Sequence, residues 1–437
     1  MLIAMLREMH QLNKQQWMNC CRLDSVILSK LRRQIARAWK FSPFYRDLFQ
    51  SAGFIPENLQ NLSDLQKLPI ITKTAIQEAG ESLFCRDIDL SKCVWLKTSG
   101  SSGSPTNLPF TRYDKSHRVL KELQALTANG YNITDRMLIL VEPRCVVDKK
   151  ALMQKLGLFR RDYLSIFEEE SIQLEAIKKL RPAVIYGYTS SLRILAEKLI
   201  SNNLEPPFPK ILMSSAELMD PATRQLLTEA FGTVPVDFYG SMEFGWIAWQ
   251  CPQKNGYHIN SDCLIVECLK DDGQPVEPGE EGELVITNLH SDAAPLIRYA
   301  TGDSAIFASK SCSCGRSLPL LSSINGRLAD CIVLPDGRKL SPYVITCTVE
   351  EIPGVRQFQV IQETDGSIRI RLLSSRLSAN PNHVKAVVEE QLDKQVRVTV
   401  EVLPELLRES NGKYKVVVSR IGADKIRTTS TDKELIS

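Results

Sequence analysis

The chain has 437 residues, of which 43% are hydrophobic and 24% are charged, and its formal net charge is +3. This composition excludes disordered and fibrous classes, and the length suffices for two or three domains. The nearly balanced charge argues against nucleic acid or an anionic membrane surface as a partner. Arg7 and Glu8 interrupt the first apolar residues too early for a secretory signal, and no later run approaches a spanning helix. We therefore expect a cytoplasmic protein.

Residues 25–41 predict an amphipathic helix, because apolar side chains recur there at helical spacing with basic residues between them. The Ser42-Pro43 break marks its expected end. Such a helix could pack against its own chain or against a second subunit, so the sequence leaves a homodimer open.

Short apolar segments then alternate with helical patterns, at residues 137–141, 183–186 and 210–213. Buried strands that alternate with helices indicate an α/β core. Farther along, turn residues surround a predicted strand at residues 283–287, so this part of the chain is expected to be β-rich.

The pattern changes again after Arg327. Strands are predicted at residues 358–361, 368–372 and 396–402, and a helix at residues 382–392. These elements form a small α+β unit of about a hundred residues, near the usual size of a domain. We place the domain boundary here, with an N-terminal domain over 1–326, a C-terminal domain over 327–437 and a hinge at 327–330.

Residues 97–106 read KTSGSSGSPT, a run of small hydroxylated residues interrupted by Gly. Such a loop lets backbone N–H groups and hydroxyls converge on phosphate oxygens. The Walker pattern needs Lys followed by Ser or Thr after its last Gly, and here Ser104 and Pro105 follow Gly103, so P-loop ATPases and GTPases are disfavoured. Taken alone, the run is more often a flexible surface loop.

Five further segments follow in order, at residues 214–217, 238–243, 298–303, 325–330 and 411–413. The first follows a strand, where open α/β sheets usually bind ligands. The second combines an aromatic suited to stack on a purine with a carboxylate suited to Mg²⁺. The third ends in a carboxylate that could accept hydrogen bonds from ribose hydroxyls. Each segment alone is as well explained by an ordinary turn or a solvated side chain.

Together and in this order, the segments resemble the acyl-adenylate-forming superfamily of acyl-CoA synthetases, adenylation domains and luciferases, over residues 97–420. Within it, the compact length and the segment YGYTSSL at residues 186–192 resemble the phenylacetate:CoA ligase-like branch and its relatives in capsule biosynthesis. The resemblance implies an α/β fold, with a large N-terminal adenylate-forming domain that has a β-rich subregion and a small, mobile α+β C-terminal domain.

The resemblance also implies residue roles. The phosphate loop would use Ser99, Gly100, Ser101, Ser102 and Gly103, and the nucleotide pocket would include Ser215, Ala216, Glu217, Gly240 and Ser241. Tyr239 would stack on adenine, Glu243 would ligate Mg²⁺, Asp303 would bind the ribose hydroxyls, and Arg327 would bind the ribose and phosphate side. Asp330 would be the hinge, and Lys413 would bridge the carboxylate and the α-phosphate. Many members place Lys where this chain has Ser104, so phosphate neutralisation would depend more on Mg²⁺ and Lys413.

The reaction implied is attack of a carboxylate on the α-phosphate of ATP, with release of pyrophosphate, and transfer of the acyl group to coenzyme A. An amine acceptor is the first alternative, because amino-acid-conjugating ligases belong to the same branch. A non-catalytic nucleotide-binding scaffold is the second. The presence of Glu243, Asp303, Arg327 and Lys413 argues against it, because a protein that only binds has little use for a mobile Lys. Tyr188, Met213 and Phe238 in the expected acyl pocket favour an apolar or aromatic acid.

Cys251, His258, Cys312 and Cys314 form a second constellation, since three thiolates and one imidazole suit tetrahedral Zn²⁺. A single residue between Cys312 and Cys314 is unusually short for a zinc pair, but similar positions in the phenylacetate ligase-like branch imply a structural zinc. The alternatives are incidental thiols or a redox-sensing pair. His117 and His290 are expected to cap or pack and not to catalyse.

Overall fold

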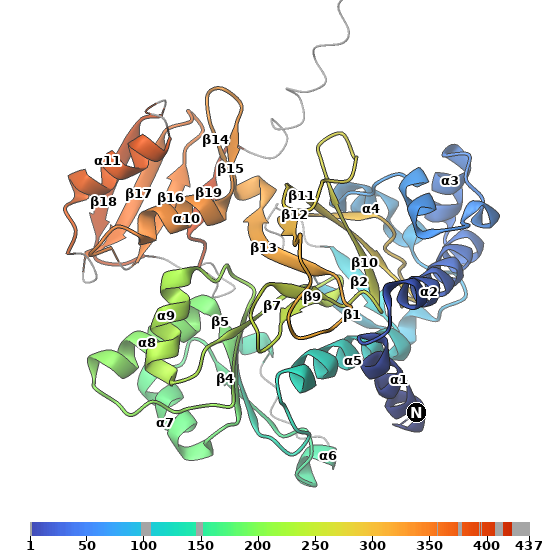
Figure 1. The fold of residues 1–437 in the computed structure, drawn as a ribbon, viewed down its shortest axis with the longest axis horizontal. Coiled ribbons are helices and arrows are strands. Elements are labelled where there is room, and N and C mark those ends of the chain that lie inside the picture. The colour runs from blue at the N-terminus through green and yellow to red at the C-terminus, as the bar shows by residue number, and fades with distance from the viewer. Residues whose placement is uncertain are drawn as a thin grey trace, which may run out of the picture. The chain divides into compact units, whose positions relative to one another are not determined.

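The computed structural model describes residues 2–97, 106–145, 152–355, 357–374, 378–392, 394, 396–406 and 414–421 (Figure 1). The chain divides into two compact units. The first contains residues 1–132, 236–301 and 305–323, and the second contains residues 133–235, 302–304 and 324–437. None of the described helices is long and apolar enough to cross a membrane.

Helices dominate the N-terminal part of the first unit, in blue and teal in Figure 1. They are α1 (Leu2–Gln15), α2 (Cys20–Phe41), α3 (Pro43–Ser51), α4 (Lys73–Ala79) and α5 (Arg112–Ala128). The predicted amphipathic helix is α2, which begins earlier than expected because the Asn19 side chain caps it by accepting from Arg22 N at 3.0 Å. Leu31, Ile35 and Ala38 on its apolar face are fully buried within its own chain.

The β-rich part of the first unit confirms the prediction made from turn residues. Its strands are β7 (Val236–Ser241), β8 (Gly245–Gln250), β9 (Tyr257–Ile259), β10 (Leu264–Leu269), β11 (Glu281–Asn288), β12 (Tyr299–Phe307) and β13 (Leu320–Arg327), in the order β10-β11-β12-β13-β9-β8-β7. A separate antiparallel pair joins β1 (Val94–Lys97) and β2 (Asn107–Phe110).

The second unit contains the predicted α/β core. Its parallel strands are β3 (Met137–Val141), β4 (Arg161–Ser165), β5 (Val184–Tyr188) and β6 (Ile211–Ser215), in the order β6-β5-β3-β4. Its helices are α6 (Leu152–Lys155), α7 (Glu170–Leu180), α8 (Thr189–Ser201) and α9 (Pro221–Phe231). Leu140, Ile185, Leu192 and Phe231 belong to the apolar core between these strands and helices.

The C-terminal part of the second unit is the predicted α+β fold, shown in orange and red in Figure 1. It contains β14 (Ile332–Val333), β15 (Lys339–Leu340), α10 (Pro342–Glu350), β16 (Phe358–Gln362), β17 (Ile368–Leu373), α11 (Pro381–Gln391), β18 (Val398–Leu403) and β19 (Val417–Ser419). The sheet order is β18-β17-β16-β19. The compact units group residues 324–437 with 133–235, and the domain boundary at residue 327 stays a prediction.

Candidate functional site

The predicted phosphate loop, Ser99 to Gly103, lies outside the described residues, but both of its flanks are placed. The strands β1 and β2 on either side of it pair antiparallel, with Lys97 opposite Asn107. The described residues on either side of the loop are therefore adjacent.

The turn between β7 and β8 carries the predicted nucleotide residues Tyr239 to Glu243. The strand register shifts between Tyr239 and Gly240, which marks a bulge. A Cβ atom at Gly240 would lie 2.5 Å from the Gly245 carbonyl oxygen, so the close approach of the two strands requires glycine. Tyr239, Gly240 and Ser241 are the last residues of β7, and Glu243 lies in the turn that follows.

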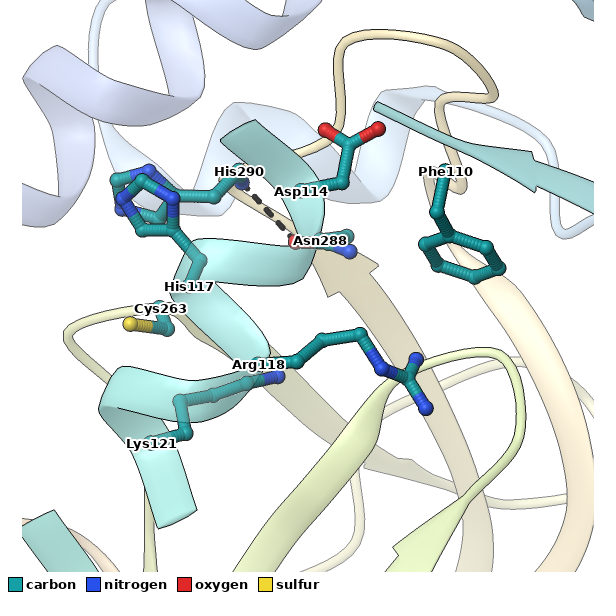
Figure 2. Close-up of a pocket in the computed structure, with 8 residues that line it drawn as sticks. All are labelled: Phe110, Asp114, His117, Arg118, Lys121, Cys263, Asn288 and His290. Carbon is teal, nitrogen blue, oxygen red and sulfur yellow. Dashed lines mark hydrogen bonds between the residues drawn. The ribbon is translucent and has the colours of Figure 1, made fainter. Parts of the chain in front are cut away.

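Two basic residues of α5 hold this turn, and the sequence analysis missed both. Arg118 Nη1 donates to the carbonyl oxygens of Met242 at 2.9 Å and Glu243 at 3.3 Å, and Lys121 Nζ donates to the carbonyl oxygen of Phe244. Burial lowers the pKa of Lys121 to about 8 and that of Arg118 to about 10. Figure 2 shows both side chains extending from α5 along one pocket. The pocket is lined by Phe110, Asp114, His117, Arg118, Lys121, Cys263, Asn288 and His290.

The loop after β6 carries Ser215, Ala216 and Glu217 in the second unit. Ser215 is buried, and its hydroxyl shares a 2.9 Å hydrogen bond with the hydroxyl of Tyr186. Ala216 has φ of 70°, a left-handed conformation that is uncommon without glycine and turns the chain sharply after the strand. The carboxylate of Glu217 accepts hydrogen bonds from other parts of the protein, and its predicted contact with nucleotide is untested.

The structure brings Asp303 and Arg327 together, although 23 residues separate them in sequence. Arg327 Nε lies 3.6 Å from Asp303 Oδ1, and the side chains are 44% and 15% exposed respectively. Both polar groups therefore remain within reach of a ligand from solvent, as binding to ribose would require. The predicted hinge residue Asp330 pairs with Lys415 Nζ at 3.4 Å, and Lys413 lies outside the described residues.

The four predicted zinc ligands converge in the first unit. Cys251 follows β8, His258 lies on β9, and Cys312 and Cys314 lie in the segment between β12 and β13. Strand pairing explains the approach, since His258 is opposite Leu320 of β13 and Trp249 of β8. Cys251 Sγ lies 3.7 Å from Cys312 Sγ, and Cys314 Sγ lies 3.3 Å from His258 Nε2. All four ligand atoms lie within 4.8 Å of one another.

The surroundings of this cluster suit a metal ion. Burial, with a contribution from the Arg316 charge, lowers the pKa of His258 to about 4, so the imidazole is neutral as ligation requires. Burial raises the pKa of Cys251, and a bound cation would be needed to favour its thiolate. Three thiols and one imidazole at these separations fit a tetrahedral, structural Zn²⁺ site.

A family model for the CapK C-terminal domain matches residues 332–420. The chain is 26% identical to the phenylacetate-coenzyme A ligase of Thermus thermophilus over 367 residues, which cover 79% of this chain and 80% of that relative. It is 24% identical to the Escherichia coli phenylacetate-coenzyme A ligase over 71% of this chain and 72% of that one. Protein CapK of Staphylococcus aureus is 23% identical, with 61% of each chain covered.

The chain is therefore similar to phenylacetate-coenzyme A ligases over most of its length, and its C-terminal part matches the CapK C-terminal domain. A solved structure of 2-hydroxyisobutyryl-CoA ligase in its postadenylation state superposes on it with a TM-score of 0.77 at 20% identity, covering 96% of this chain and 94% of that one. An open conformation of the same ligase gives a TM-score of 0.65 at 21% identity over 92% and 93% of the two chains. These similarities confirm the fold class expected from the sequence.

The structure also brings together two histidines that the sequence analysis left aside. The rings of His117 and His290 stack with centroids 3.9 Å apart and planes 17° apart (Figure 2). The carbonyl oxygen of Tyr113 only accepts, so His117 Nδ1 donates to it at 3.1 Å, while His117 Nε2 faces Glu8 Oε1 at 2.8 Å. The hydrogen bond between Nε2 and Glu8 then requires a further proton, either on Nε2 or on the carboxyl group of Glu8.

These two histidines and Glu8 have ligand atoms close enough for one metal ion. The stacking argues against that use, because an ion bound in the plane of both rings needs planes that converge, and these are nearly parallel. The cluster joins α1, α5 and the segment after β11 by packing, as the sequence analysis expected for both histidines.

Proposed function

We propose that this protein activates a carboxylic acid with ATP to form an acyl-adenylate, releases pyrophosphate, and transfers the acyl group to coenzyme A. The observation that carries the proposal is similarity to a phenylacetate-coenzyme A ligase over 79% of this chain and 80% of that relative. The six motif segments also occur in the order that the superfamily resemblance requires.

The main physical difficulty of the first step is the repulsion between two anions, the substrate carboxylate and the α-phosphate. In the proposal, Lys413 contacts both and stabilises charge that develops on the phosphoryl oxygens. Tyr239 stacks on adenine and Asp303 accepts from the ribose hydroxyls, so the α-phosphate is held in line with the acid. Glu243 is the residue proposed to hold Mg²⁺, which would offset the charge of the departing pyrophosphate.

The zinc proposal is structural. Four protein ligands leave no open position for a reacting water, so Cys251, His258, Cys312 and Cys314 would only fix the segment between β12 and β13 against β8 and β9. The hydrogen bond from Ser317 N to the Gln16 carbonyl oxygen at 2.8 Å ties the same segment to the residue that follows α1.

The acid is proposed to be apolar or aromatic. Tyr188 and Met213 are buried in the second unit, and the hydroxyl of Tyr188 donates to Glu142 Oε1 at 3.2 Å. The Glu142 carboxylate therefore satisfies the Tyr188 hydroxyl, and the apolar ring of Tyr188 can pack against an apolar or aromatic acid. The acceptor, a homodimer and the cytoplasmic location stay predictions from the sequence.

The experiment that tests the function is exchange of labelled pyrophosphate into ATP, across aryl, fatty and amino acids, with Lys413→Ala as the control. Exchange that depends on one class of acid supports adenylation and identifies the substrate class. Coenzyme A and amines are then supplied with that acid, and formation of a thioester is the expected product. Amide formation would favour the amine alternative, and no exchange with any acid would contradict the proposal and favour the scaffold.

A further inference from the structure

Glu217 joins two distant parts of the second unit through its carboxylate. Oε2 accepts the backbone N–H of Ser190 at 2.6 Å. Oε1 accepts the Ser190 hydroxyl at 3.0 Å and the backbone N–H of Tyr414 at 2.9 Å. The donors therefore come from the start of α8 and from a residue 197 positions beyond Glu217 in the chain.

The start of α8 explains why a carboxylate is favourable here. The residue that precedes the helix, Tyr188, makes no capping hydrogen bond with its side chain. The N–H of Ser190 in the first turn would otherwise have no partner within the helix, and a negative charge at this end is favoured by the helix dipole. The hydroxyl of Thr189 also donates to the Glu217 carbonyl oxygen at 3.3 Å, so backbone and side chain of Glu217 are both fixed.

Tyr414 is held from its other side by the C-terminal sheet. It is 8% exposed, and its hydroxyl donates to the carbonyl oxygen of Phe358 in β16 at 2.6 Å. Three residues later β19 begins, which pairs parallel with β16. The N–H that Glu217 accepts belongs to Tyr414, the residue that directly follows Lys413 in the sequence.

We propose that Glu217 is a positioning residue for acid activation, which holds the backbone N–H of Tyr414, the residue that follows Lys413 in the sequence, against the loop after β6. The inference rests on the proposed function, in which Lys413 acts on the α-phosphate. It gives Glu217 a different role from the nucleotide contact that the family resemblance implied. Hydrogen bonds to an ionised carboxylate are stronger than neutral ones, so loss of this group should release the segment.

Glu217→Ala and Glu217→Gln test the proposal, with Ser190→Ala as the matched control. The control removes one hydroxyl donor but keeps both backbone N–H groups that Glu217 accepts. We expect Glu217→Ala to lower the rate constant of acid-dependent pyrophosphate exchange by about tenfold or more, with little change in the KM for ATP. Glu217→Gln, which keeps one acceptor oxygen, should fall between Glu217→Ala and the unsubstituted protein, and Ser190→Ala should exchange normally.

The second half-reaction separates positioning from a general loss of structure. Each variant is given a synthetic acyl-adenylate and coenzyme A, and the rate of thioester formation is measured. Positioning of Lys413 predicts an unchanged rate, since the lysine acts only while the acid and the α-phosphate are being joined. Equal loss in both half-reactions, or wild-type exchange by Glu217→Ala, would overturn the proposal.

Hydrogen–deuterium exchange distinguishes failure of this inference from failure of the proposed function. Peptides that contain Tyr414 should exchange faster in Glu217→Ala than in the unsubstituted protein or in Ser190→Ala. If the unsubstituted protein activates no acid, the proposed function fails, and the exchange measurement still decides the contact. Unchanged exchange at Tyr414 in Glu217→Ala would remove the positioning role even in an active enzyme.

Discussion

Compared with the nucleotide motifs, the cysteine–histidine cluster is confined to one compact unit, where its four ligand atoms lie within 4.8 Å of one another. The nucleotide motifs are divided between the two units, and Asp303 and Glu217 contact other protein groups. A structural metal site is completed by protein ligands, whereas a nucleotide site is completed by its substrate. Damage to the cluster should therefore act first on stability, and damage to the motifs first on turnover.

The largest effect is expected for Lys413→Ala. Loss of a charge that stabilises the transition state should slow adenylate formation by about a hundredfold to a thousandfold while folding is retained. Pyrophosphate exchange and thermal unfolding together measure both properties. Lys385→Ala, which removes an exposed lysine on α11, is the control and should retain activity. A destabilised Lys413→Ala protein would contradict the expectation that the nucleotide motifs affect turnover and the cysteine–histidine cluster affects stability.

Loss of zinc should produce the largest change in stability. Protein purified without chelator should contain about one zinc ion per chain, and Cys251→Ser should lose it together with about 3 kcal/mol or more of stability. Elemental analysis and denaturant unfolding measure the two effects. Cys93→Ser, at a partly exposed cysteine outside the cluster, should keep the metal. Stable, folded protein without metal would contradict the prediction.

Lys121→Met should have a smaller effect, which changes both the stability of the protein and its binding of ATP. The substitution leaves the Phe244 carbonyl oxygen without its buried donor, which costs about 1–3 kcal/mol. Because this carbonyl follows Glu243, the KM for ATP should rise as stability falls. Lys115→Met on the same helix is the matched control. A loss of stability with an unchanged KM would show that the β7–β8 turn does not depend on this anchor for nucleotide binding.

A pH dependence of stability is expected at Glu350. Burial, followed by a hydrogen bond and repulsion from Asp220, raises the pKa of Glu350 to about 8, although Arg193 Nη1 at 2.8 Å favours its ionised form. Because its pKa is higher in the folded state, protonated Glu350 stabilises the folded protein. This stabilisation is complete below the pKa of the unfolded state, near 4.5, and is lost as the pH rises through about 8. The lowered pKa of Asp220 changes the stability of the protein only at more acidic pH.

Thermal unfolding between pH 5 and pH 8 measures this dependence. Glu350→Gln should flatten the decline in stability, and the exposed neighbour substitution Glu351→Gln should leave it unchanged. An identical pH profile in Glu350→Gln would contradict a protonated Glu350 in the folded protein.

The elements for which sequence periodicity gave a range lie within a few residues of observed elements. The predicted strand at residues 137–141 is β3, and the predicted helix at 382–392 is α11. Several strands were not predicted, among them β4 and β19. All of β4 is partly exposed and lacks a clear alternation of apolar and polar residues, and β19 has only three residues. Such segments become strands because a neighbouring strand pairs with them, which local sequence does not reveal.

The sequence by itself determined which chemical groups this protein has and their order along the chain, including the nucleotide motifs and three thiols with one imidazole. Only the tertiary structure decided which groups meet: the pairing of Asp303 with Arg327, the buried contact of Lys121 with the β7–β8 turn, and the contact of Glu217 with Tyr414. The physical reason is that repeating patterns record local backbone geometry, whereas contacts between distant residues depend on how strands pair and helices pack.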